Sequence, residues 1–197
     1  MYKKQLGFQK IVCLVCVVAA ALAFVYSLGI VTDLFDSLYS TMWNPNDLTQ
    51  TDVPGSIIYY DIQDFNKQYV NVNIVVILTA VLLFITNTHS RRRYYVGNYA
   101  AVGIFTVAAL GVTVWSHGQI EQYKHQYLTT VDFEALREFS ELWETPYIES
   151  TFWLDAHYVV GGVMCLAVAA LIGNMVWKIV LMQGEKKLLK AGEEAAV

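Results

Sequence analysis

The sequence predicts an all-α integral membrane protein: a bundle of four transmembrane helices with two outer loops, the second of which contains an amphipathic helix. The chain of 197 residues has only 15% charged residues and a mean hydropathy of +0.41, whereas water-soluble domains carry about 25% charged residues. Four stretches, residues 11–32, 70–88, 94–116 and 156–177, contain no Asp, Glu, Lys or Arg. Each has about the length that crosses a hydrocarbon core of about 30 Å. Without an internal linker or repeat, the whole chain, 1–197, is expected to be a single membrane domain.

The distribution of basic residues predicts the sidedness of these helices. Ten of the 13 basic residues lie on one side, in the amino-terminal flank, the 88–99 hairpin and the carboxyl-terminal flank: Lys3, Lys4, Lys10, Arg91, Arg92, Arg93, Lys178, Lys186, Lys187 and Lys190. The other side keeps three basic residues beside 14 acidic ones. Because basic loops stay in the cytoplasm, we expect both termini inside a plasma or bacterial inner membrane and the loops 33–69 and 117–155 outside it.

The arginine triplet Arg91, Arg92 and Arg93 is interpreted as a topology anchor that holds the short hairpin inside and contacts anionic lipid. Binding of nucleic acid is the weaker interpretation, because the net charge is −4 and the chain has no second basic patch. The expected partners are therefore the lipid bilayer and other membrane-protein subunits, and no nucleic acid.

The first helix, residues 11–32, has an alternative interpretation. A basic start, an apolar run and the small residues of 21–23 also fit a cleaved signal peptide. The apolar run continues to Val31, beyond the usual signal core of about 7 to 15 residues. We therefore expect an uncleaved anchor.

The first outer loop, 33–69, is kept in water by six aspartates and is broken by turn signals at 44–46 and 54–55. Apolar residues at near-helical spacing in 32–42 predict an extension of the first helix or a short surface helix. The stretch 56–62, SIIYYDI, is rich in strand formers and favours a short strand. Such a strand would need a partner strand or another protein to cover its edges.

The helices 70–88 and 94–116 are separated by only about five residues, so they are expected to pack as an antiparallel pair. The second outer loop, 117–155, contains an amphipathic pattern: its apolar face holds Phe133, Leu136, Phe139, Leu142 and Trp143 and its opposite face is acidic. Thr130 or Asp132 is the expected start of this helix and Pro146 its stop. Because the polar face is not basic, as lipid-bound helices require, we expect protein to cover the apolar face: the first outer loop or another chain.

The last helix, 156–177, carries a stripe of small residues at Gly161, Cys165, Ala169 and Gly173. Small residues at this spacing let a neighbouring backbone approach closely. We favour internal packing against Ala19 and Ala23 of the first helix over an interface with another subunit.

Two groups of residues raise the question of redox or metal chemistry. Cys13 and Cys16 form a Cys-x-x-Cys pair inside an apolar helix, where burial disfavours the thiolate, so we expect a structural role. His117 and His157 lie at the outer ends of two helices. Together they are weak candidates for a metal or haem site. The favoured interpretation is that both are ordinary histidines at the membrane interface that bind no cofactor.

The helices carry no acidic or basic residue at mid-membrane, where a transporter would place one. Nor does the chain contain a phosphate-binding loop or a nucleophile elbow. We expect no catalytic residue, metal or cofactor, and favour a non-enzymatic accessory or assembly subunit of a larger membrane complex such as a transporter. One alternative is a homo-oligomeric channel lined by Thr79, Asn98, Thr106 and Thr113; another is a membrane haem or metal-binding redox protein.

Overall fold

A computed structural model describes residues 2–42, 52–89 and 96–194 of the chain. Within them the chain forms six α-helices and one short 3-10 helix: α1 Tyr2–Gly29, α2 Thr32–Leu38, η1 Tyr39–Thr41, α3 Ile58–His89, α4 Val96–Thr130, α5 Phe133–Trp143 and α6 Phe152–Glu194. The arginine triplet 91–93, predicted to anchor the hairpin, lies outside the described residues, as does the 44–46 turn.

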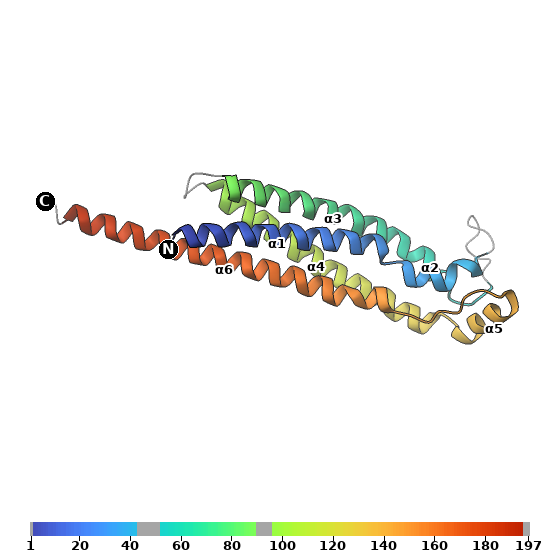
Figure 1. The fold of residues 1–197 in the computed structure, drawn as a ribbon. Coiled ribbons are helices and arrows are strands. Elements are labelled where there is room, and N and C mark those ends of the chain that lie inside the picture. The colour runs from blue at the N-terminus through green and yellow to red at the C-terminus, as the bar shows by residue number, and fades with distance from the viewer. Residues whose placement is uncertain (1, 43–51, 90–95, 195–197) are drawn as a thin grey trace.

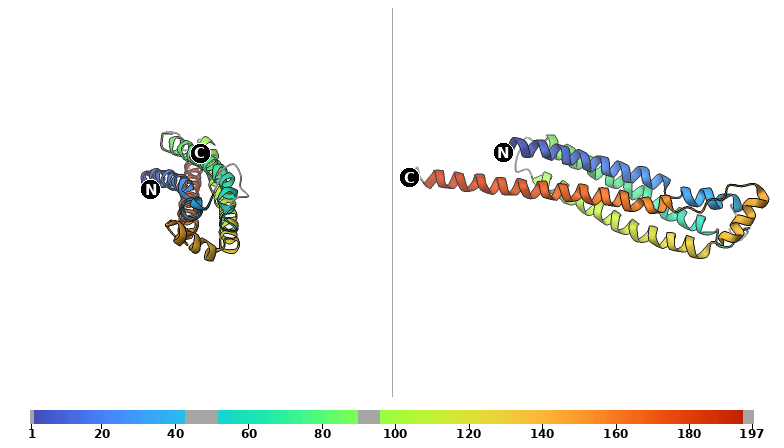
Figure 2. Two further views of the ribbon diagram at one scale, coloured as in Figure 1. Left: turned by 90° about the vertical axis from the view of Figure 1, so that its right-hand side faces the viewer. Right: turned by 60° about the horizontal axis from the view of Figure 1, so that its bottom comes forward.

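The four long helices α1, α3, α4 and α6 run side by side as an up-down-up-down bundle (Figures 1 and 2). Each packs against two others, in the ring order α1, α3, α4, α6 and back to α1. Because consecutive helices in this ring run in opposite directions, every neighbouring pair is antiparallel, as short connections require. Both ends of the described chain lie at the same end of the bundle (Figure 1).

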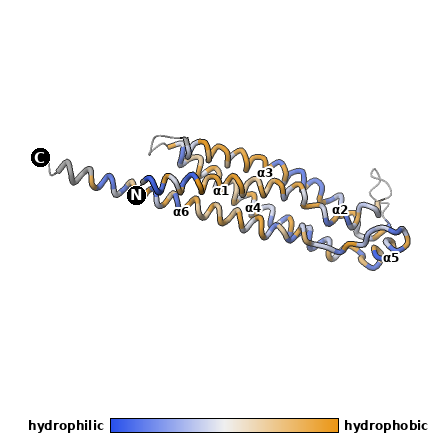
Figure 3. Tube along the Cα trace, viewed as in Figure 1, coloured by the Kyte–Doolittle hydropathy of each residue, from blue (hydrophilic) through white to orange (hydrophobic). Residues whose placement is uncertain are grey.

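All four long helices are long and apolar enough to cross a membrane, which confirms the predicted helical bundle with four candidate membrane spans. Their apolar middles and more polar ends are visible in Figure 3. At about 1.5 Å per residue, the 35 residues of α4 extend for about 52 Å. This length exceeds the hydrocarbon core of about 30 Å, so a membrane would cover only part of α4.

The predicted strand at 56–62 is wrong, because α3 already begins at Ile58. Ile58, Ile62, Phe65 and Tyr69 are all buried, and their spacing of three and four residues is that of one helix face. The predicted end of the third helix near residue 116 is also wrong, since α4 continues to Thr130. Hydropathy marks where a chain leaves lipid and not where a helix ends. The segment 117–130 is helical because Ile120 and Tyr127 are buried against its neighbours, and it contains no proline that would interrupt it.

The core has two parts, one at the level of the apolar helix middles and one in the outer head. The first is built largely from small side chains, including Cys13, Cys16, Ala19, Ala20 and Ala23 of α1. Small residues are what close helix packing in lipid requires. Both cysteines are fully buried, and the Cys16 thiol contacts the Ala167 carbonyl at 3.7 Å.

The second core belongs to what we call the outer head: α2, η1, α5 and the ends of α3, α4 and α6 that adjoin them, seen at the right of Figure 1. Its α5 is the predicted amphipathic helix, and the Asp132 side chain caps it by accepting hydrogen bonds from the Glu134 and Ala135 amides (3.1 and 3.0 Å). The buried Asp33 carboxylate of α2 accepts a hydrogen bond from the Trp153 amide (2.6 Å), in the first turn of α6. A carboxylate there is favoured by the dipole of the helix.

Candidate functional site

The structure brings together His117 of α4 and His157 of α6, the two histidines singled out in the sequence. The His117 Nδ1 and His157 Nε2 atoms are 2.8 Å apart. The His157 Nδ1 atom lies 2.6 Å from the Leu154 carbonyl, which can only accept, so Nδ1 carries the proton. When both rings are neutral, His117 Nδ1 must therefore donate to His157 Nε2. This leaves His117 Nε2 as an acceptor.

Charged and polar side chains surround this histidine pair. Glu121 accepts a hydrogen bond from the Tyr158 hydroxyl (2.8 Å), and its Oε1 atom lies 3.6 Å from His157 Nε2. One turn further out, the Lys124 ammonium pairs with the Asp155 carboxylate, which also accepts from the Thr151 hydroxyl (2.7 Å). These contacts join α4 to the start of α6 at the outer end of the bundle.

Sequence reasoning did not assign Glu121 and Lys124 to this site. They follow His117 by four and seven residues, the spacing of one helix face. This spacing is present in the sequence, but it places the three side chains on one face only if the helix continues beyond residue 116.

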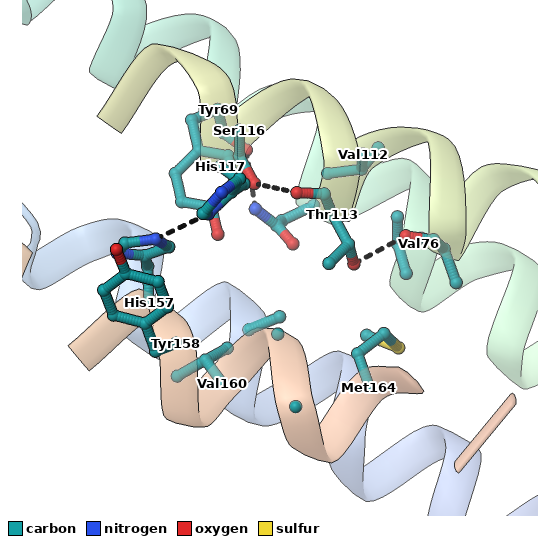
Figure 4. A pocket seen from close by; sticks show the side chains of 15 residues that line it. Tyr69, Val76, Val112, Thr113, Ser116, His117, His157, Tyr158, Val160 and Met164 are labelled. Carbon is teal, nitrogen blue, oxygen red and sulfur yellow. Dashed lines mark hydrogen bonds between the residues drawn. The ribbon is translucent and has the colours of Figure 1, made fainter. Parts of the chain in front are cut away.

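Below the histidine pair, a cavity of about 200 Å³ lies among all four long helices (Figure 4). Its polar wall is formed mainly by α3 and α4, with Asn73, Thr113, Ser116 and His117, and its floor by Ala23, Val76, Ala109 and Met164. The wall therefore combines hydrogen-bonding groups at the outer end with an apolar interior. Pockets that bind small molecules usually have this combination.

The arrangement of the histidines bears on the alternative of a metal or haem site. The hydrogen bond between the two rings occupies the nitrogen atoms that face each other. Among residues 2–42, 52–89 and 96–194, no three or more His, Cys, Asp or Glu side chains are grouped so that they could hold a metal ion. His117 and His157 thus form a hydrogen-bonded pair, and a metal or haem site at these residues stays a prediction.

The residues of the predicted small-residue stripe of α6 do not share one environment: one faces α4 and the other three are exposed. Gly161 faces α4, where an added Cβ would lie 3.3 Å from Thr113 Cγ2. Cys165, Ala169 and Gly173 are exposed on the outer surface of the bundle. The α6 residues buried in one core cluster with Ala19 and Ala23 are instead Met164, Ala167, Val168 and Leu171. An interface between subunits at the stripe stays a prediction.

The end of the bundle opposite the outer head holds a network of buried amides that sequence reasoning did not predict. Every long helix contributes at least one member: Gln5, Gln9, Asn87, Asn98 and Asn174. Gln5 Nε2 donates to Gln9 Oε1 and Asn174 Oδ1 (3.1 Å each). Gln9 Nε2 donates to the backbone oxygen and Oδ1 of Asn87 (2.9 and 3.2 Å). Such bonds join α1 to α3 and α6 and specify how these helices are paired.

Lys178 lies close to this network, although the sequence placed it in the cytoplasmic flank. It is only 4% exposed, and its ammonium lies 5.3 Å from the centre of the Tyr99 ring. The sequence contained one indication of this burial: Lys178 follows Asn174 by four residues, which puts both side chains on one face of α6.

The polar residues proposed to line a shared channel do not form one outward face. Asn98 is buried, and the Thr106 hydroxyl is buried without a hydrogen-bond partner. The hydroxyls of Thr79 and Thr113 donate to carbonyls of their own helices, at Val76 and Ala109 (2.8 Å each).

The predicted apolar face of α5 is partly covered by the outer head. Leu136 is buried, and Phe133 and Phe139 pack against the head core. Leu142 and Trp143, at the end of the same helix, are 75% and 60% exposed. The first outer loop and its neighbours thus cover only the first part of this helix.

No protein-family model, curated protein or solved structure matches the chain. Function must therefore be inferred from two features of the described residues. One is the outer head with its exposed apolar side chains, and the other is the cavity beneath the histidine pair.

Proposed function

We propose that the protein is a non-enzymatic accessory subunit that binds a larger membrane protein through the outer head. The observation that carries the proposal is the exposure of Leu142 and Trp143 at the end of α5. The rest of the apolar face of α5 packs into the head core. Exposed large apolar side chains on an otherwise folded extramembrane head are typical of a protein-binding surface.

The charge around this surface indicates the chemistry of the partner. Glu138, Glu141 and Glu144 lie beside Leu142 and Trp143 and are exposed. A complementary partner presents an apolar pocket bordered by lysine or arginine side chains. Opposite charge at the border steers association and selects the partner.

The membrane part supports the same role. Beneath the cavity, the core of the described bundle is filled by small and apolar side chains such as Ala80, Phe105 and Leu171. A bundle of this kind would hold the outer head in a fixed position at the membrane surface. We propose a plasma or bacterial inner membrane, with the head outside and both termini in the cytoplasm, because ten of the 13 basic residues belong to the two terminal flanks and the 88–99 segment of the sequence.

The orientation can be tested by cysteine labelling in whole cells. In a background without the three native cysteines, we compare Glu138→Cys on α5 with Lys186→Cys on α6, both exposed positions. A membrane-impermeant maleimide is expected to label Glu138→Cys in intact cells and Lys186→Cys only after permeabilisation. Labelling of both positions from the same side would contradict a four-helix topology, and the reverse pattern would contradict the proposed orientation.

The docking surface can be tested with two leucines of equal exposure. Leu142 in the head and Leu188 on the inner extension of α6 are each 75% exposed. Leu142→Glu is expected to weaken co-purification of the partner from native membranes, solubilised in mild detergent, by at least about tenfold, because a central apolar anchor contributes about 1–2 kcal/mol or more. Leu188→Glu introduces the same charge at the opposite end and is expected to leave the complex intact.

The measurement is quantitative mass spectrometry of the purified complexes, with each variant first checked for unchanged thermal unfolding. A partner retained equally by both variants would show that α5 does not bind it. A chain that purifies as a monomer, with no stoichiometric partner in any variant, would contradict the proposed role altogether.

A further inference from the structure

The cavity beneath the histidine pair opens between α4 and α6. Of its lining residues, His117, Tyr158 and Gly162 are exposed, whereas Ala23, Asn73 and Met164 are buried. The opening thus lies on the side where α4 meets α6, and the deep wall lies toward α1 and α3. Tyr69, Trp115 and Tyr158 are at the same level of the bundle, and such aromatic side chains favour the membrane–water interface. A molecule dissolved in the outer leaflet can therefore enter from the side.

The two hydroxyls of the wall, those of Thr113 and Ser116, have already used their donors. The Thr113 hydroxyl donates to the Ala109 carbonyl (2.8 Å), and the Ser116 hydroxyl donates to the Thr113 carbonyl (3.2 Å). The Asn73 amide donates one of its two N–H groups to the Tyr69 carbonyl (2.9 Å). A hydroxyl oxygen that donates once still has lone pairs to accept with. The wall therefore offers hydroxyl acceptors beside the second Asn73 N–H, and a ligand hydroxyl, which both donates and accepts, matches it.

The charge and size of the cavity further restrict the class of ligand that fits it. Its lining contains no Asp, Glu, Lys or Arg, and the Glu121 carboxylate beyond it already accepts from the Tyr158 hydroxyl (2.8 Å), so an ionic head group would enter at a large cost in desolvation. A cavity of about 200 Å³ has room for one hydroxyl and a short carbon chain. A longer chain extends through the opening into lipid.

We propose that this cavity binds a neutral, membrane-soluble alcohol. Its hydroxyl donates to the oxygen of Thr113 or of Ser116, and its carbon chain lies on the apolar floor formed by Ala23, Val76 and Met164. The site is independent of the docking surface on α5, which lies in the outer head (Figure 1).

The test uses the full chain in phosphatidylcholine nanodiscs and a decanol analogue with a photoreactive diazirine on its chain. Gly162 and Gly173 are both exposed glycines of α6, eleven residues apart and hence on nearly the same face. An added Cβ meets no atom within 4 Å at either position. Gly162→Leu places four carbons at the cavity opening and is expected to reduce labelling of the 109–117 and 157–164 peptides at least about tenfold. Gly173→Leu, away from the cavity, is expected to leave it unchanged.

Head-group specificity is measured by competition. Unlabelled decanol is expected to compete with the probe, and decanoate, decyltrimethylammonium and decane are expected to compete at least about tenfold less. The double variant Thr113→Val with Ser116→Ala keeps the shape of the wall but removes both hydroxyls. It is expected to abolish the preference for decanol over decane, and it tests the proposal independently if Gly162→Leu fails to fold.

Three outcomes would overturn the proposal. Equal competition by decane would show an apolar crevice without recognition of a hydroxyl. Stronger competition by the ammonium compound would show a cation site. Labelling spread along all lipid-facing helices, and equal in Gly162→Leu and Gly173→Leu, would show contact with bulk lipid only.

Discussion

Gly55→Ala is expected to destabilise the outer head by at least about 3 kcal/mol, the largest single effect we predict. Gly55 has a φ of +84°, where an L side chain is strained. An added Cβ would lie 2.0 Å from the Thr130 carbonyl oxygen and 2.8 Å from Val131 Cα. Both are backbone atoms, held in place by the hydrogen bond from the Asp132 amide to the Pro54 carbonyl (3.1 Å). The clash can be relieved only by separating the start of α3 from the end of α4.

The measurement is thermal unfolding followed by tryptophan fluorescence, together with limited proteolysis of the head in detergent. Gly118→Ala is the matched control, because Gly118 is helical, exposed and has no atom within 4 Å of an added Cβ. There alanine is expected to stabilise the protein by about 0.5–1 kcal/mol through helix propensity. Unchanged unfolding and proteolysis in Gly55→Ala would contradict the close approach of these two segments.

Tyr127→Ala is expected to have the second largest effect, a loss of about 3–5 kcal/mol in the stability of the head. Tyr127 of α4 is completely buried. Its ring packs edge-on against Phe133 of α5, with ring centroids 5.3 Å apart. Its hydroxyl donates to Ser37 of α2 (3.2 Å), and Ser37 in turn donates to the Ile148 carbonyl (2.7 Å). One side chain thus joins three parts of the head to α4.

Two further variants separate the contributions of the ring and the hydroxyl. Tyr127→Phe removes only the hydrogen bond and is expected to cost about 1 kcal/mol. Leu128→Ala, at the exposed neighbouring position, is expected to change stability by no more than about 0.5 kcal/mol. Chemical denaturation of the three variants gives the comparison. Equal losses for Tyr127→Ala and Leu128→Ala would mean that the head has no packed core around Tyr127.

The sequence was sufficient to predict α5 nearly to the residue. Its apolar residues recur at helical spacing, and Asp132 precedes them as a cap. The same kind of reasoning failed at 56–62, where the β-branched and aromatic residues suggested a strand. Local propensity is weak there, and burial of Ile58 and Ile62 in the head core favours the helix.

The sequence placed His117 and His157 at the same depth, but their contact at 2.8 Å depends on the packing of α4 beside α6. The buried face of α6 was harder to predict, since its apolar residues surround the whole helix. A polar signal did exist: His157 and Lys178 are buried on the same heptad-spaced face as Met164 and Leu171. The prediction relied instead on the small-residue stripe, most of which lies on a different, exposed face of α6.

The sequence by itself determined that the described chain has four apolar helices, because burial in lipid depends on the hydropathy of each segment alone. Only the tertiary structure decided the order of the helices around the bundle, the rotation of each helix, the folded outer head and the cavity beneath the histidines. Those features depend on shape and hydrogen bonding between residues far apart in the chain, such as Gln5 with Asn174 and Gly55 with Thr130. In lipid, where an apolar side chain gains little by facing a neighbour instead of the bilayer, such contacts determine which faces meet.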